Sequence, residues 1–168
     1  MKLSAVFLLV FSMVALTSGF RFTVCRFRRM CFPVIKRCPR GWTEINGRCF
    51  LYVARPCTWA NAEKICQALG ANLASVHNVY EYHRIQVLIR VVGHNSRPTW
   101  IGGSDAQQER TWLWSDGRPM RYTNWCRGEP NNVRGKQNCL LMNWSGGKCW
   151  DDYYCDYRWP SVCAKKLR

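Results

Sequence analysis

An α+β domain is the fold class that the sequence predicts, and three features of the chain indicate it. Two segments, at residues 58–70 and 78–92, carry apolar residues at helical spacing. After residue 98 the apolar runs become short and rich in aromatic and β-branched residues, which is typical of strands. A polar loop over residues 124–139 interrupts these runs. We therefore expect two helices packed on short antiparallel sheets, with one long polar loop.

The amino-terminal residues 1–19 have the layout of a cleaved secretory signal. Lys2 precedes an apolar run over residues 5–16, and small residues follow at 17–19. The run is too short to span a bilayer comfortably, although a retained membrane anchor is the alternative. We place cleavage after Gly19 and expect a secreted, extracellular protein. No later stretch is apolar enough to cross a membrane.

Residues 20–37 form a distinct segment that is basic and contains cysteines. The segment has no acidic residue and several aromatic ones. Basic and aromatic residues together suit a lipid interface, so one interpretation is a membrane-active or anion-binding arm. The other interpretation, which we favour, is a solvated linker that carries interchain disulfides. The main domain then covers residues 38–168.

Charge and cysteine content restrict the possible partners and the compartment. The formal net charge is +15 at pH 7, which favours anionic lipid or sulfated glycan as a partner. Nucleic acid is not expected as a partner of a secreted protein. All eleven cysteines follow the signal, and in an oxidising compartment they predict a disulfide framework. Because the number is odd, one thiol is free or pairs with another chain.

Local signals place the first hairpin and both helices. Asn46-Gly47 lies between two apolar runs and predicts a hairpin turn, across which Cys38 and Cys49 are expected to pair. Thr58 is the expected N-cap of the first helix, and Gly70 its stop. In the second helix, Asn78 with Glu81 three residues later forms a capping box.

An ordered set of motifs carries a family resemblance that covers residues 38–165. The set comprises "GWTEINGRCF", "TWANAEKICQALGANLASVHN", "TWIGGSD", "WLWSDGRPMRYTNW", "GEPNN", "CWDD" and "PSVCAKK". In this order the motifs resemble C-type lectin-like domains, and in particular the secreted fish lectins and the related type II antifreeze proteins. The resemblance implies an α+β lectin fold and a non-enzymatic, binding function.

The resemblance also implies a pattern of disulfides. The family's pairs correspond to Cys38–Cys49, Cys66–Cys163 and Cys139–Cys155, and the antifreeze relatives add Cys126–Cys149. The last pair agrees with a local argument, because Cys126 and Cys149 closely precede two acids, Glu129 and Asp151, that the family brings to one site. The cysteines that remain are Cys25, Cys31 and Cys57. Any of them is a candidate for an interchain bond, and we expect a disulfide-linked homo-oligomer.

Calcium is the cofactor that the resemblance implies. The family holds its sugar-binding ion with positions that match Glu129, Asn131, Gln137, Asp151 and Asp152. Carboxylate and amide oxygens are the ligands that Ca²⁺ prefers, and Pro130 resembles the family's cis proline. Two positions depart from the pattern, because Gln137 stands where an acid is usual and Asp151 where an asparagine is usual. A loop that has lost its metal is the alternative. Asp105 and Glu109 match positions of a second, structural calcium site of some relatives, whose other positions fall on the amides Asn132 and Asn138.

Sugar binding follows from the same oxygens, through Glu129, Asn131, Gln137 and Asp151. The Glu-Pro-Asn triplet is the family's mannose-type triplet, but the two departures leave galactose open as the preferred sugar. Trp150 is interpreted as a core residue, whereas Trp144 is either a core residue or a stacking surface for a sugar. Asn143 begins a glycosylation sequon.

The leading interpretation is a secreted, calcium-dependent lectin of innate immunity that agglutinates microbes by binding surface glycans. An ice-binding protein and a membrane-active toxin or antimicrobial that acts through the basic segment are the alternatives. An enzyme is not expected. The three histidines (His77, His83 and His94) have no nucleophile or metal-ligand spacing beside them, and no phosphate-binding loop is present.

Overall fold

The structure is a computed structural model that describes residues 36–168. The expected signal, and the basic segment apart from Lys36 and Arg37, lie outside the described residues. The strands are β1 (Thr43–Ile45), β2 (Arg48–Cys57), β3 (Asn72–Leu73), β4 (Thr99–Ser104), β5 (Leu113–Trp114), β6 (Cys139–Trp144), β7 (Cys149–Tyr153) and β8 (Trp159–Lys166). The helices are α1 (Trp59–Ala68), α2 (Val79–Gly93) and a short 3₁₀ turn, η1 (Val133–Gly135).

The strands form one mixed sheet in the order β1-β2-β8-β4-β6-β7, with β3 beside β8 and β5 beside β4. Every pairing is antiparallel except the one between β4 and β8, which meet in parallel at Trp100 and Ser161. The α+β class is confirmed: two helices accompany short strands that pair antiparallel apart from this one contact. The last strand returns between β2 and β4, so it joins the first hairpin to the strands that follow the helices.

The first hairpin turns where the Asn-Gly pair predicts. Asn46 and Gly47 have φ values of 50° and 70°, both in the left-handed region, which matches the twist of the strands that they join. β1 pairs with β2 across this turn, and Cys38 is bonded to Cys49 on β2. The disulfide therefore ties the start of the described chain to the sheet.

Both helices begin at the predicted caps. Thr58 Oγ1 accepts from Asn61 N at the start of α1, and Asn78 Oδ1 accepts from Glu81 N at 2.8 Å at the start of α2. The capping box differs in one respect, because the Glu81 carboxylate accepts from His77 N at 2.9 Å instead of from the N-cap N–H. Glu81 also meets the buried Arg48 guanidinium at 3.4 Å, so the cap of α2 is linked to β2.

Trp150 lies at the centre of the larger core cluster, as the sequence indicates. Its ring is fully buried and makes edge-to-face contacts with Tyr82, Trp114, Tyr122 and Trp125. Such contacts add to the hydrophobic gain of burying large aromatic side chains. Because Asp151 and Asp152 follow Trp150 on β7, this core fixes the strand that carries them.

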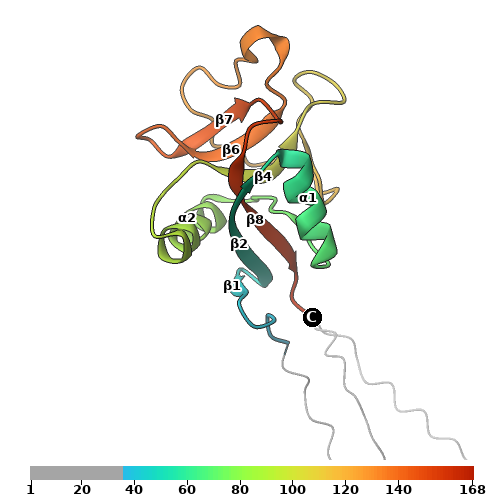
Figure 1. Cartoon of the computed structure of the whole chain (residues 1–168), viewed down its shortest axis with the longest axis vertical. Helices are drawn as coiled ribbons and strands as arrows, with labels where there is room; N and C mark the ends of the chain where they lie inside the picture. Colours follow the sequence, from blue (N-terminus) through green and yellow to red (C-terminus); the bar gives the residue numbers. More distant parts are fainter. Residues whose placement is uncertain (1–35) are drawn as a thin grey trace, which may run out of the picture. The chain divides into compact units, whose positions relative to one another are not determined.

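The long polar loop between β5 and β6 is held against β7 by the backbone. Cys126 N donates to Trp150 O, and Trp150 N donates to Asn124 O, both at 2.8 Å. The loop and β7 lie at one end of the domain, whereas the β1–β2 turn and the end of β8 lie at the other (Figure 1).

Candidate calcium and sugar site

Three carboxylates from two distant segments meet at the loop end of the domain. Glu129 comes from the polar loop, while Asp151 and Asp152 are consecutive on β7. One carboxylate oxygen from each lies within 4.8 Å of the others. Among the described residues, none of the three forms a salt bridge with a Lys, Arg or His side chain. Like charges held this close repel, so the arrangement is of the kind that a divalent cation stabilises.

Burial and mutual repulsion shift the pKa values of two carboxylates in this cluster. Burial, together with the negative charges of Glu129 and Asp152, raises the pKa of Asp151 to about 7. Burial also raises the pKa of Glu129, and the neighbouring Asp152 contributes to that rise. Without a cation, the cluster therefore tends to hold a proton near neutral pH.

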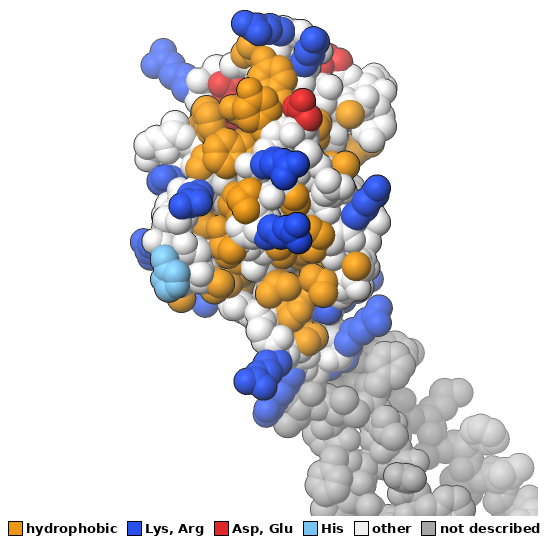
Figure 2. Space-filling model, viewed as in Figure 1, with side chains coloured by type: hydrophobic (Ala, Val, Ile, Leu, Met, Phe, Trp, Pro, Cys, Tyr) orange, Lys and Arg blue, Asp and Glu red, His pale blue; other side chains and the backbone are white. Residues whose placement is uncertain are grey.

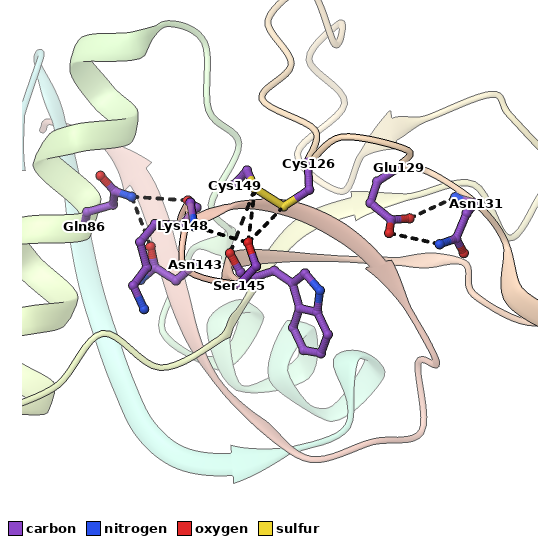
Figure 3. Close-up of a disulfide and its surroundings, with 10 residues drawn as sticks. Gln86, Cys126, Glu129, Asn131, Asn143, Ser145, Lys148 and Cys149 are labelled. Carbon is purple, nitrogen blue, oxygen red and sulfur yellow. Dashed lines mark hydrogen bonds between the residues drawn. A yellow bond between two sulfur atoms is a disulfide. The ribbon is translucent and has the colours of Figure 1, made fainter.

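Backbone and amide donors hold these carboxylates in place. Asp152 accepts from Asn131 N at 3.0 Å and from Asn132 N at 2.7 Å. The side-chain amide of Asn131 donates to Glu129 Oε1 at 2.9 Å, and these two side chains point toward each other (Figure 3). The peptide bond between Glu129 and Pro130 is cis. Glu129, Asn131, Asp151 and Asp152 are thus brought together.

Gln137 takes part in the loop through a different contact. Its Oε1 accepts from Val133 N at 2.7 Å, and its backbone N donates to Asn132 Oδ1 at 3.0 Å. The side chain is buried, so its oxygen faces the interior of the loop. Gln137 can serve as a metal ligand only through the remaining lone pair of this oxygen, or by giving up the bond to Val133.

Asn132, which the resemblance assigns only to the second site, also takes part in this one. It adopts φ 44°, and it contributes a backbone donor to Asp152 and a side-chain acceptor for Gln137. Its side-chain amide also donates to Glu109. Asparagine tolerates the left-handed region and forms local hydrogen bonds to the backbone, and this preference was the sequence feature that pointed to a structural role in the loop.

The second candidate site is only partly assembled. Asp105 is buried, and its Oδ2 accepts from Arg110 N at 2.8 Å, whereas its Oδ1 has no hydrogen-bond partner in the described part of the chain. Burial raises the pKa of Asp105, and Asp152 adds to that effect. Glu109 meets Asn132 but forms no three-acid group with Asp105, so we assign no metal to this location.

Four disulfides are present in the described chain, and they are the pairs that the resemblance implies: Cys38–Cys49, Cys66–Cys163, Cys126–Cys149 and Cys139–Cys155. Cys126–Cys149 joins the polar loop to the start of β7, and Ser145 Oγ contacts both sulfur atoms (Figure 3). Cys66–Cys163 encloses 97 residues, which is worth about 4–5 kcal/mol in the chain-entropy model. Cys57 is unpaired within residues 36–168.

The sequon residue Asn143 is 1% exposed, which disfavours the predicted glycan. Its Oδ1 accepts from Gln86 Nε2 at 3.2 Å (Figure 3). Its Nδ2 lies 3.5 Å from Arg97 O. A glycan on Nδ2 would have to leave through this packed region. Trp144 is partly exposed and contacts Tyr153, so the choice between a core and a stacking role stays open.

The fold and the position of the acid cluster define a class of protein, and the comparisons with known proteins agree with it. Residues 55–165 match the family model for the lectin C-type domain. The chain therefore belongs to the C-type lectin domain family.

Curated relatives include both lectins and ice-structuring proteins. The chain is 45% identical to ladderlectin of Oncorhynchus mykiss over 77% of this chain and 68% of the relative. It is 39% identical to the galactose-specific lectin nattectin of Thalassophryne nattereri, over 77% and 81% of the two chains. It is also 40% identical to a type-2 ice-structuring protein of Hemitripterus americanus, over 79% of each.

Solved structures show the same mixture. Herring type II antifreeze protein is similar with a TM-score of 0.73 and 39% identity, over 78% of this chain and all of that one. The carbohydrate-recognition domain of cow CD23, solved with a GlcNAc2Man3 oligosaccharide, gives a TM-score of 0.71 and 28% identity, over 79% and 98% of the chains. No helix within residues 36–168 is long and apolar enough to cross a membrane.

Proposed function

We propose that this protein is a secreted, calcium-dependent lectin that binds glycans on microbial or cell surfaces. The observation that carries the proposal is the meeting of Glu129, Asp151 and Asp152 beside Asn131. Three carboxylates and an amide oxygen are hard ligands of the kind that Ca²⁺ takes in extracellular modules. Affinity for the ion on the order of 0.1–1 mM is expected for such a module.

The residues that would hold Ca²⁺ are Glu129, Asn131, Asp151 and Asp152, with Gln137 as a fifth candidate. The bound ion would supply coordination positions for two neighbouring hydroxyls of a hexose. The same side chains then recognise those hydroxyls, because carboxylates accept hydrogen bonds and amide nitrogens donate them. Glu129 and Asn131 form one such acceptor and donor pair, and Asp151 faces them from β7.

Mannose-like sugars are the proposed ligands, because the Glu-Pro-Asn triplet is the mannose-type triplet of the family. Galactose remains the alternative, because Gln137 and Asp151 depart from the mannose-type order of donors and acceptors. The relatives include proteins named galactose-specific and lactose-binding, which supports keeping that alternative. A single site of this kind binds with roughly millimolar affinity, near 4 kcal/mol. Agglutination in innate immunity would therefore need several sites in one covalent or non-covalent assembly.

A calcium titration of the mature protein, followed on tryptophan fluorescence, tests the metal site directly. A glycan array with and without a chelator then tests the sugar site. We expect saturable calcium binding and glycan binding that the chelator abolishes. Glycan binding that persists in the chelator, or no glycan binding with calcium saturated, would contradict the proposal.

Ice binding is the second candidate, because relatives at 39–40% identity are type-2 ice-structuring proteins. Thermal hysteresis in a dilute solution of the mature protein distinguishes it from the lectin function. The membrane-active alternative depends on the basic segment, most of which lies outside the described residues. Leakage of anionic vesicles tests that alternative.

A further inference from the structure

A basic groove lies at the end of the domain opposite the acid cluster. Two hollows, with volumes of about 290 and 310 Å³, share the lining residues Gly70, Lys165, Lys166 and Arg168, so they adjoin at the end of β8 and are together called the groove. Six basic side chains line the groove: Arg37, Arg48, Arg118, Lys165, Lys166 and Arg168. Asp116 is its one acidic lining residue within the described chain.

The negative charge of Asp116 is already balanced by neighbouring groups in the groove. Asp116 Oδ2 lies 3.6 Å from Arg118 Nε and 3.9 Å from Arg48, and it accepts from Ser75 Oγ. Arg48 is 6% exposed and is fixed by bonds to Ser75 and by the ion pair with Glu81. Arg48 therefore forms a rigid floor, and Asp116 does not neutralise the cations along the rim.

The rim of the groove carries the accessible charge. Lys165 Nζ donates to Leu69 O at 3.0 Å and lies 4.0 Å from the Trp42 ring centroid, so its position is defined. Lys166, Arg168 and Arg37 are exposed and form no salt bridge with any described acid. Lys and Arg side chains are present at this end of the domain in the space-filling view, and others are spread over the rest of the visible face (Figure 2).

We propose that this groove binds a linear sulfated polysaccharide. Several cations around these two hollows match a chain that repeats sulfate groups, and guanidinium groups bind such oxyanions in a bidentate manner. A membrane surface fits less well, because Leu69, at 41% exposure, is the sole large exposed hydrophobic residue among the groove's described lining residues. The end of β8, which borders the groove, and β7, which carries two of the acids, lie at opposite ends of the domain (Figure 1), so we expect binding here without calcium.

Immobilised heparin provides the test, with the full mature protein kept in a chelator. Retention on heparin should persist in the chelator and disappear on desulfated heparin. Lys166→Glu with Arg168→Glu should lower heparin affinity about tenfold at 0.15 M NaCl and reduce the slope of log affinity against log salt by about one to two. Lys166→Gln with Arg168→Gln, a milder pair, should lower affinity in the same direction.

Lys64→Glu with Arg84→Glu is the matched control, because both residues are exposed on the helices and the change in net charge is identical. The proposal requires that this control lose less than about threefold in affinity. Equal losses in the two charge-reversed pairs would mean that only net charge matters and would overturn the proposal. Retention that needs calcium, or a groove variant that loses phosphatidylserine-vesicle binding but keeps heparin binding, would overturn it as well.

Discussion

Asn131 and Glu129 face each other across Pro130, with Asn131 Nδ2 2.9 Å from Glu129 Oε1. The backbone N–H of Asn131 lies between two acids, because it donates to Glu129 at 3.1 Å and to Asp152 at 3.0 Å. One residue therefore orients carboxylates from both segments of the candidate site. The acids of the proposed calcium site are therefore held close together by the protein itself.

Replacement of Glu129 by Gln should weaken calcium binding by about tenfold or more, because it removes one of three negative ligands while keeping the side chain's shape. The change is measured as the dissociation constant for Ca²⁺ in a fluorescence or calorimetric titration. Glu44→Gln is the matched control, since Glu44 is exposed on β1, far from the loop. Calcium affinity that is equal in the two variants would show that Glu129 is not a ligand.

The raised pKa of Asp151 predicts how pH affects the calcium-free protein. Its pKa is about 7 in the folded state, against an ordinary value near 3.8, so the folded protein binds more protons between these limits. Its contribution to the free energy of unfolding therefore falls as pH rises from about 4 to about 7. Asp151→Asn removes this contribution and should stabilise the calcium-free protein at pH 7.5 by on the order of 2 kcal/mol.

Urea unfolding of Asp151→Asn and wild type, in a chelator, at pH 4 and pH 7.5 provides the measurement for this effect. The comparison is needed because burial and Arg48 lower the pKa of His77, which reduces stability as pH falls below about 6.5 in both proteins. The stabilisation should shrink toward zero near pH 4. An Asp151→Asn variant that is less stable than wild type at pH 7.5 would refute the assigned repulsion.

Local signals in the sequence predicted the turn and the helix starts well. Asn46-Gly47 fixes the hairpin because both residues tolerate left-handed backbone, and Thr58 and Asn78 cap because their side chains accept from helix N–H groups. The acid cluster was predicted only through the family resemblance. No local rule brings Glu129 to β7, twenty-two positions away in the chain.

Features that depend on packing between distant segments could not be predicted. The sequence did not indicate that Gln137 would turn its oxygen to Val133, or that Glu81 would bond to His77 and Arg48. The basic groove is a clearer case, since its lining residues come from both ends of the described chain and from the middle. The composition predicted affinity for anions, but only the fold shows which basic residues come together on the surface.

Replacement of Arg48 by Leu should lower the free energy of unfolding by about 3–5 kcal/mol, because it leaves the Glu81 carboxylate, 1% exposed, without its cation. Chemical denaturation at pH 7.5 measures the loss. Arg84→Leu is the control, since Arg84 is exposed on α2 and should change stability by less than about 0.5 kcal/mol. A loss for Arg48→Leu below about 1 kcal/mol would mean that the hydrogen bonds from Asn46 and His77, together with water, compensate Glu81.

Cys57 is the cysteine through which a covalent dimer is expected if Cys25 and Cys31 pair with each other. Within residues 36–168 it is the free thiol, and its partial burial raises its pKa, so less reactive thiolate is present at neutral pH. Interchain oxidation should therefore be slow but complete in the secreted protein. A gel without reductant should show a dimer for wild type and a monomer for Cys57→Ser. Ser145→Ala, at a residue that contacts the Cys126–Cys149 sulfurs, should remain dimeric. If Cys57→Ser still runs as a dimer, the interchain bond is formed by Cys25 or Cys31. If reductant does not change the mobility of the wild type, the protein is not a covalent dimer.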